Sequence, residues 1–215
     1  MNENNNSILI LEEMMKRTRR FALEKDVSVY DVVHEALDRF LYSHETGINF
    51  ADILGGIETG MSEPEYFVTS VDLYGYTVIV KSPIRYIHRP ELKYKIVITQ
   101  NDSVSAGKMC VTLRSHDINT LRRFSEFLNL WITLETNHIQ FGGQIKYITD
   151  AGYFERKVYI PVSPQRISGQ IIGAAISDYI HVFDELLKYF FNHPNDIYEI
   201  EKIYRDRVKN GKLKI

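Results

Sequence analysis

The chain contains 215 residues, of which 44% are hydrophobic and 25% are charged. These fractions are typical of folded soluble domains and exclude a disordered chain or a collagen-like repeat. The 26 lysines and arginines nearly balance the 28 aspartates and glutamates, so the chain as a whole is not a polyanion binder. The single cysteine, Cys110, excludes an internal disulfide framework and a cysteine-based structural zinc site.

The N-terminus lacks the features of a secretion signal. Residues Met1–Asn6 carry no positive side chain, and the apolar run Ile8–Leu11 is too short for the hydrophobic region of such a signal. No stretch approaches the ~18 consecutive apolar residues that a membrane-spanning helix needs. We therefore expect a cytoplasmic protein that does not bind a membrane.

The first 42 residues predict a short strand followed by two helices. Ser7–Leu11 is apolar and strand-like, and residues 12–25 place apolar side chains three and four residues apart, as on one face of a helix. Ser28 is a favourable helix N-cap, and Asp31 occupies the capping-box position three residues later. The second helix is expected from about Val29 to Tyr42.

The following segment, residues 43–64, collects four glycines and Pro64. Glycine and proline are the residues that most often interrupt helices and strands. We expect a linker here, with about one turn of helix around Asp52–Ile57.

From Tyr66 onward the hydrophobic period changes to two, which is typical of strands. The expected strands are Phe67–Val80, Lys93–Thr99, Lys108–Arg114, Thr136–Thr149 and Tyr153–Pro161. Asp117 is expected to cap a helix after the third strand, and Asp150-Ala151-Gly152 is a strong hairpin signal between the last two. A long helix is expected from Ser163-Pro164 to about Asn192, and a last helix after Pro194 to about Val208.

These elements predict an α+β protein with an antiparallel sheet. Its expected parts are a strand-helix-helix dimerisation unit at residues 1–48, a linker at 49–64, and a βββ-α-ββ-α-α domain at 65–215. The last fifteen residues of the chain are basic and are a further candidate for contact with an acidic partner.

Ala22, the corner Asp26-Val27-Ser28 and the run Ser28–Leu41 form a pattern that resembles the ribbon-helix-helix family of bacterial DNA-binding dimers. The resemblance covers residues 7–42. It implies that the N-terminal strands of two subunits pair and enter the DNA major groove, while the second helix holds a phosphate at its N-terminus. The candidate DNA or phosphate contacts are Ser7, Lys16, Arg17, Arg20 and Ser28.

The charge of this segment departs from that pattern. The expected strand contains no lysine or arginine, and residues 1–48 carry six basic and nine acidic side chains. Affinity for DNA depends on cations that neutralise phosphates. Dimerisation of an amphipathic helical hairpin without DNA binding is the alternative.

The order βββ-α-ββ-α, the helix Leu121–Trp131, the step Phe141-Gly142-Gly143 and the segment Phe183–Leu186 are similar to the YbjN-like family. The fold of that family is the fold of type III secretion chaperones, and the similarity covers residues ~64–192. It implies a non-enzymatic, protein-binding module that is often dimeric and has no cofactor.

The pattern of chemically active residues predicts no catalytic, cofactor-binding or metal-binding site. The seven histidines include no pair at the i, i+4 spacing of a helical zinc site, and no nucleophile elbow, phosphate loop or dinucleotide motif is present. Cys110 is expected to be a small core residue.

Tyrosines of the expected strands are the candidate partner-binding residues, because alternate residues share a sheet face and uncovered aromatic rings are good anchors. The set comprises Tyr74, Tyr76, Tyr86, Tyr94, Tyr147, Tyr153 and Tyr159, of which Tyr74, Tyr76, Tyr147 and Tyr159 are the preferred candidates. The alternative is a sheet whose tyrosines are covered by the two long helices.

Together these patterns favour a non-enzymatic regulatory or protein-binding homodimer, chaperone-like and without a cofactor. The alternative is a ribbon-helix-helix transcriptional regulator with a C-terminal sensor or interaction domain.

Overall fold

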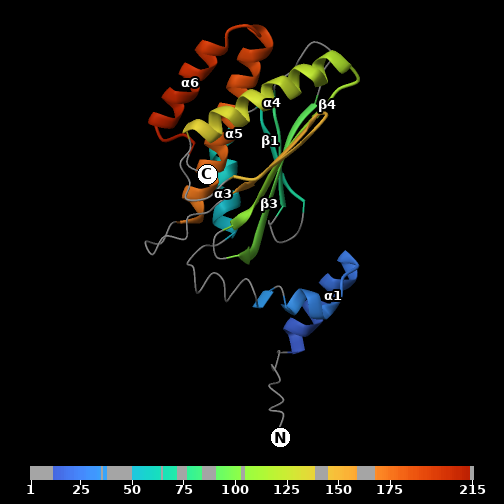
Figure 1. The fold of residues 1–215 in the computed structure, drawn as a ribbon. Helices are drawn as coiled ribbons and strands as arrows, with labels where there is room; N and C mark the ends of the chain where they lie inside the picture. Colours follow the sequence, from blue (N-terminus) through green and yellow to red (C-terminus); the bar gives the residue numbers. More distant parts are fainter. Residues whose placement is uncertain are drawn as a thin grey trace, which may run out of the picture. The chain divides into compact units, whose positions relative to one another are not determined.

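The computed structural model describes residues 12–34, 36–37, 50–63, 65–71, 77–83, 91–102, 105–138, 145–158 and 168–213. The chain divides into two compact units, Met1–Gly47 and Ile48–Ile215, and each is considered by itself. The larger unit combines helices with one antiparallel sheet (Figure 1), which confirms the predicted α+β class.

The smaller unit contains helix α1 (Glu12–Lys25) and a second helical stretch at residues 29–34 and 36–37. Asp26 joins them with a left-handed φ of 54°. The predicted capping box is present: the Ser28 hydroxyl accepts the Asp31 backbone N–H at 3.0 Å and donates to the Asp31 carboxylate at 2.7 Å. The predicted strand Ser7–Leu11 and the end of the second helix lie outside the described residues.

The larger unit is built on a six-stranded sheet with the order β1-β2-β3-β4-β6-β5, in which all neighbours are antiparallel. Its strands are β1 (Phe67–Ser70), β2 (Thr77–Lys81), β3 (Glu91–Asp102), β4 (Ser105–Arg114), β5 (Tyr147–Asp150) and β6 (Tyr153–Val158). The edge strands β1 and β5 have four residues each, whereas β3 and β4 have 12 and 10.

Two of the predicted strands are wrong. The expected strand Phe67–Val80 is a hairpin of β1 and β2, which pair with each other. The expected strand Thr136–Thr149 begins inside a helix, because α4 (Ile118–His138) continues to residue 138 and β5 begins at Tyr147. The predicted turn Asp150-Ala151-Gly152 does join β5 to β6, with Gly152 at a left-handed φ of 74°.

Two further helices follow the sheet. Helix α5 (Gly169–Asn192) begins after Ser168, whose side chain accepts the Ile171 N–H. The predicted start at Ser163-Pro164 lies outside the described residues. Helix α6 (Ile197–Lys209) is capped by Asp196 in the same way. Among the described helices, none combines the length and the apolar character needed to cross a membrane.

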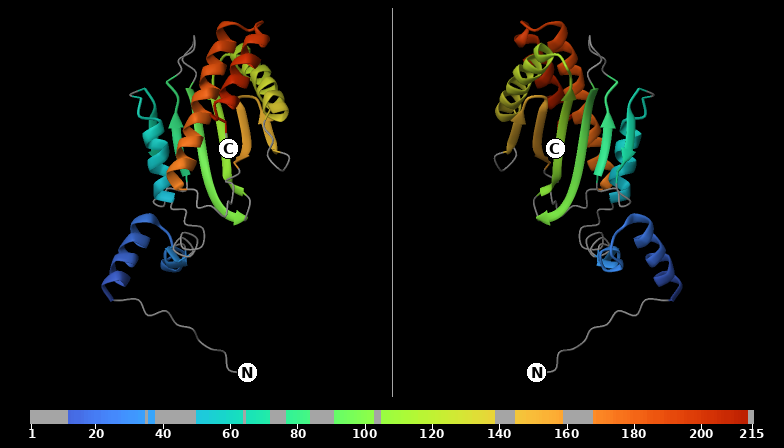
Figure 2. Two further views of the ribbon diagram at one scale, coloured as in Figure 1. Left: turned by 90° about the vertical axis from the view of Figure 1, so that its left-hand side faces the viewer. Right: turned by 90° about the vertical axis from the view of Figure 1, so that its right-hand side faces the viewer.

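The described helices of this unit, α3 (Phe50–Gly60), α4, α5 and α6, lie on one side of the sheet (Figures 1 and 2). The core forms between them and that sheet face. Its centre is a group of aromatic rings in contact, contributed by the sheet and by helices α4, α5 and α6: Tyr94, Phe127, Trp131, Phe154, Tyr179, Phe183 and Tyr204. Aromatic pairs in edge-to-face contact add stability beyond the area they bury.

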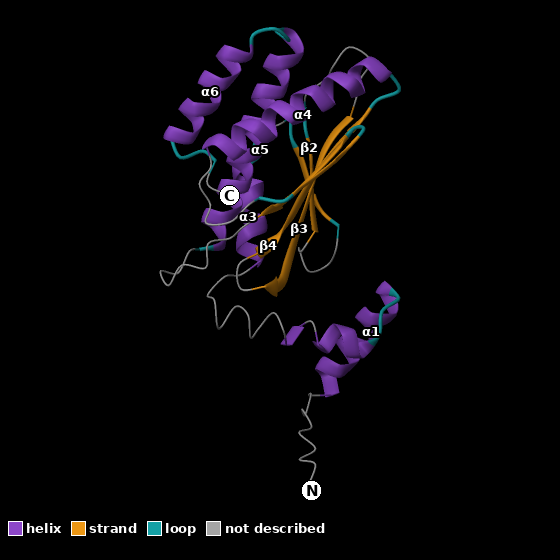
Figure 3. Cartoon of the chain, viewed as in Figure 1, coloured by secondary structure: helices purple, strands orange, loops and turns teal. Residues whose placement is uncertain are grey.

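The segment predicted as a linker at residues 49–64 instead contains α3, drawn as a helix against α5 in Figure 3. Phe50, Ile53 and Ile57 of α3 are buried. Gly56 and Gly173 allow the two helix backbones to touch, since a Cβ built on Gly173 would lie 2.2 Å from the Ile53 carbonyl oxygen. These glycines are therefore packing residues, and α3 belongs to the larger unit.

We predict that Gly173→Ala destabilises the protein by about 1–3 kcal/mol, because the new methyl group collides with backbone atoms that cannot rotate away. The matched control is Gly55→Ala on α3, where an added Cβ meets no atom within 4 Å. That variant is expected to gain about 0.5–1 kcal/mol, because alanine favours helix over glycine. Urea unfolding measures both, and equal midpoints for Gly173→Ala and the wild type would contradict the close contact.

Candidate functional site

The sheet has two faces with different side chains. One face is covered by the helices, and we call the other the open face, because no described helix of this unit lies on it (Figure 2). Strand register places four cross-strand rows there. The rows are Glu91–Arg114; Phe67–Lys81–Lys93–Thr112–Tyr153–Asp150; Thr69–Ile79–Lys95–Cys110–Glu155–Ile148; and Thr77–Val97–Lys108–Lys157.

Cations outnumber anions on the open face. It carries five lysines and Arg114, against Glu91, Asp150 and Glu155. Two pairs of lysines stand directly opposite each other on neighbouring strands: Lys81 with Lys93, and Lys108 with Lys157. Like charges in directly opposite positions destabilise a sheet. The face is thus a positively charged surface on a nearly neutral chain.

Part of this charge is compensated within the face. Glu91 accepts Lys93 at 3.0 Å and Lys81 at 3.5 Å, and Glu155 accepts Lys108 at 3.1 Å. The hydrogen bond from Lys93 helps hold the pKa of Glu91 below its usual value. No described carboxylate forms an ion pair with Lys95, Arg114 or Lys157, so these three exposed cations can attract an external anion.

A compact polar cluster occupies the middle of the open face. The Tyr153 hydroxyl donates to Glu155 at 2.6 Å and also lies 3.4 Å from the Cys110 sulfur. Cys110 is buried as predicted, but it lies on the face opposite the helices, beneath Tyr153 and Glu155. Burial raises the pKa of the Cys110 thiol, and the neighbouring Glu155 adds to this increase. The sulfur is therefore a protonated thiol at neutral pH and a poor nucleophile.

The candidate tyrosines do not share one face. Tyr147 and Tyr94 lie on the helix-covered face, where Tyr147 stacks on Phe154 and Tyr94 is fully buried. Tyr153 lies on the open face. Tyr74, Tyr76, Tyr86 and Tyr159 are outside the described residues. The sequence prediction did not include the open-face lysines. The signal that could have indicated them is the alternation of lysine with large apolar or aromatic side chains in Lys93-Tyr94-Lys95 and in Lys108-Met109-Cys110.

The candidate DNA contacts of the smaller unit are mostly engaged already. Lys16 pairs with Glu12 at 2.9 Å and Arg17 with Glu13 at 3.1 Å, while Arg20 is 3.9 Å from Glu24. All these side chains are exposed, so each pair contributes little to stability. The Ser28 hydroxyl is used in the capping box, and Ser7 lies outside the described residues.

The basic C-terminal segment is also largely compensated. Arg207 forms two hydrogen bonds to Glu185, at 2.6 and 2.9 Å. Lys212 pairs with Asp178 at 2.7 Å, and Lys202 pairs with Glu199 at 3.0 Å. The contacts of Arg207 and Lys212 attach α6 and the residues after it to α5, whereas the Lys202–Glu199 pair lies within α6. This arrangement favours a structural role for the charge of the segment.

Two buried carboxylates lie on the helix-covered side. Glu135 of α4 faces Arg156 of β6 at 3.3 Å, both fully buried, and the guanidinium lies over the Tyr179 ring. Burial raises the pKa of Glu135, and the positive charge of Arg156 opposes that shift. A buried pair of this kind couples two layers of the fold, although its desolvation cost offsets most of the attraction.

Asp184 of α5 is the second buried carboxylate. It accepts hydrogen bonds from Tyr66 at 2.8 Å, from Ser82 at 2.6 Å and from Tyr94. Burial nevertheless raises the pKa of Asp184 to about 6. These donors come from the segment before β1, the end of β2 and the middle of β3, so one side chain of α5 binds three parts of the sheet region.

No group of three or more histidine, cysteine or acidic side chains suited to a metal ion occurs among the described residues. Comparisons of the chain with models of known protein families, with curated proteins and with solved structures found no match. The open face and the charges that it carries are therefore the main indication of function among the described residues.

We predict that Asp184→Asn flattens the dependence of stability on acidic pH. The folded-state pKa of about 6 exceeds the usual 3.8, so between about pH 4 and pH 6 the folded state holds a proton that the unfolded state releases. The free energy of unfolding of the wild type should thus fall as pH rises through this window, by up to about 3 kcal/mol from this group. Urea unfolding at several pH values measures the slope.

The control for this experiment is Ser177→Ala, which removes a buried polar side chain without an ionisable group from the same helix. It should retain the wild-type slope. A slope in Asp184→Asn as steep as in the wild type would show that Asp184 does not bind the proton.

Proposed function

We propose that this protein is a non-enzymatic, dimeric binding protein whose open face holds an acidic segment of a partner protein. The observation that carries the proposal is the excess of cations on this face, where Lys95, Arg114 and Lys157 form no ion pair with a described carboxylate. Neighbouring cations without a partner repel each other in the free protein. An anionic partner relieves this repulsion and gains the ion pairs.

The chemistry of the face favours an acidic polypeptide over a small substrate. The cations extend over β2, β3, β4 and β6, so a ligand that meets them all is extended. Ile79, Val97 and Phe67 lie between or beside them and offer apolar contact. Charge complementarity between such a surface and an acidic partner speeds association and sets partner choice.

The dimer part of the proposal is supported by the smaller unit. Among its described residues only Ala22 is buried, while Leu23, Tyr30 and Met14 are 87%, 73% and 59% exposed. Two short helices with one buried side chain have too little core to be stable alone. Pairing with the same unit of a second chain would cover these apolar side chains.

The alternative, a ribbon-helix-helix regulator of transcription, remains a second proposal on the resemblance of residues 7–42. The capping box at Ser28 agrees with it. The pairing of Lys16 and Arg17 with glutamates on the same helix weighs against it, because those cations are shared with internal carboxylates.

We predict that the full chain binds poly-L-glutamate, and that the double variant Lys95→Glu/Lys157→Glu binds it about tenfold more weakly. Each exposed ion pair contributes up to about 1 kcal/mol, and charge reversal adds repulsion. Fluorescence anisotropy at two salt concentrations measures the affinity, which should fall as salt rises. The matched control reverses two cations elsewhere, Lys188 and Arg205, and should bind like the wild type.

Two outcomes would contradict this assignment. One is an equal loss in the control variant, which would show that only net charge matters. The other is binding of a single-stranded DNA oligonucleotide with no binding of poly-L-glutamate, which would identify the face as a nucleic-acid surface.

We also predict that the chain is a dimer of about twice 25.1 kDa and that Leu23→Glu/Tyr30→Glu makes it monomeric. Charges at these exposed apolar positions would be buried without partners in the paired unit. Light scattering after size exclusion measures the mass. Arg19→Glu, also on α1, is the control and should remain dimeric, and a dimeric double variant would refute this role of the helices.

A further inference from the structure

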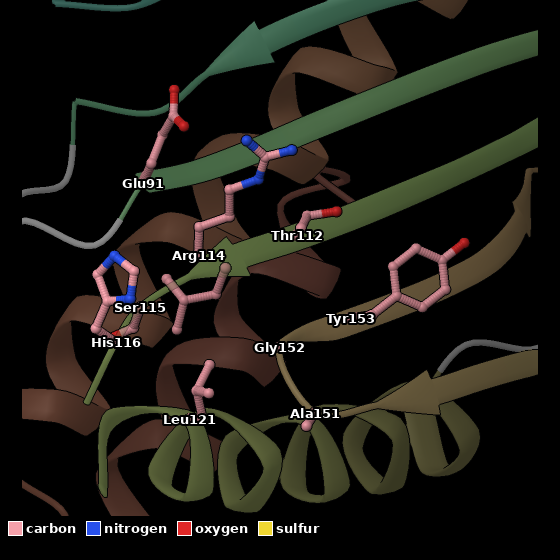
Figure 4. Close-up of a pocket in the computed structure, with 10 residues that line it drawn as sticks. Glu91, Thr112, Arg114, Ser115, His116, Leu121, Ala151, Gly152 and Tyr153 are labelled. Carbon is pink, nitrogen blue, oxygen red and sulfur yellow. The ribbon is translucent and has the colours of Figure 1, made fainter. Parts of the chain in front are cut away.

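A pocket of about 690 Å³ lies at one end of the open face, where β4 ends and α4 begins. Figure 4 shows the side chains around it, and we call it the end pocket. The lining residues that matter here are Glu91 of β3, Arg114 of β4, His116 of the loop between β4 and α4, Leu121 of α4, Gly152 of the β5–β6 turn and Tyr153 of β6. The volume is within the range of small-molecule sites.

The charge of the end pocket is positive. Glu91 is its one lining carboxylate among these residues, and it is already neutralised by Lys93 at 3.0 Å and Lys81 at 3.5 Å. Arg114 stands directly opposite Glu91 in the strand register, yet no described carboxylate forms an ion pair with it. The guanidinium of Arg114 is therefore the uncompensated charge of the pocket.

The other side of the end pocket is apolar and rigid. Leu121 of α4 and the ring of Tyr153 line it, and the Tyr153 hydroxyl is held by Glu155 at 2.6 Å. The turn is pinned by a hydrogen bond from the Leu113 N–H to the Gly152 carbonyl oxygen at 2.8 Å. A Cβ at Gly152 would lie 2.6 Å from the Leu113 carbonyl oxygen, so only glycine lets the turn approach this closely.

We propose that the end pocket binds a small organic anion, whose carboxylate or phosphate oxygens pair with Arg114 and whose apolar body lies against Leu121 and Tyr153. A guanidinium offers two parallel N–H donors, which match two oxygens of one such group. His116, in the loop after β4, also lines the pocket and adds ring nitrogens that can form hydrogen bonds. This site goes beyond the proposed partner-binding function, because it takes a small organic anion at one end of the open face rather than an extended polypeptide across it.

The proposal is tested with the full chain, by titration followed in backbone amide NMR shifts. The probes are benzoate and phenyl phosphate, with neutral benzamide and cationic benzylamine as charge controls. We expect saturable shifts confined to residues 112–116 and 151–153 with at least one of the two anions, and none with the two control compounds. The stronger anion distinguishes a carboxylate site from a phosphate site. Equal binding of benzamide, or shifts elsewhere only, would overturn the proposal.

Two further comparisons make the test specific. Arg114→Gln should weaken binding by about tenfold or more, because it removes the charge-assisted hydrogen bonds between the guanidinium and the anion. Arg122→Gln, an exposed arginine of α4 outside the lining set, should bind like the wild type. Unchanged affinity in Arg114→Gln would overturn the assignment of Arg114. Inorganic phosphate that binds as tightly as phenyl phosphate would overturn the role of the apolar wall.

Discussion

Helix α5 carries thirteen buried residues along its 24-residue length, and it can bury them only against one face of the sheet and the helices beside it. This requirement makes the two faces of the sheet unequal. The covered face takes Val80, Tyr94 and Phe154, while their strand neighbours Lys81, Lys95 and Glu155 point to the other side. The binding surface that we propose is thus a consequence of how the core is packed.

The same helix carries groups that attach the layers by directional contacts rather than by area alone. Asp184 accepts hydrogen bonds from three parts of the sheet region, and Gly173 lets α3 approach within backbone contact. Hydrophobic burial does not select one alignment of a helix on a sheet, because it has no direction. Hydrogen bonds and close backbone contacts do, so they define the position of α5 more sharply than its leucines do.

Several elements could be predicted because their signals are local. The capping box at Ser28, the turn at Asp150–Gly152 and the helix after Asp117 depend on residues within a few positions of each other. Gly56 was interpreted as part of a linker, because its role in helix packing depends on the contact with Gly173, which is distant in the sequence. Likewise, Thr133 and Thr136 have β-branched side chains typical of strands, but inside α4 their hydroxyls bond to the carbonyls of Asn129 and Ile132.

The candidate site was harder to predict than the fold for a related reason. Lys81, Lys93, Lys108 and Lys157 come from four strands, and only the register shows that they form two opposed pairs. Arg114 and Gly152 likewise line one pocket because β4 pairs with β6, although helix α4 and strand β5 separate these two strands in the sequence. Strand order and register are non-local properties that a single sequence does not encode in any short pattern.

The short edge strands have a consequence for how such molecules behave at high concentration. An uncovered sheet edge offers free N–H and C=O groups to another chain, and long flat edges are the usual starting point of polymerisation. Here the longest strands, β3 and β4, are interior, and the two outer strands have only four residues each. Within the described residues, the sheet thus combines a broad charged face with edges that are too short for a neighbouring molecule to extend.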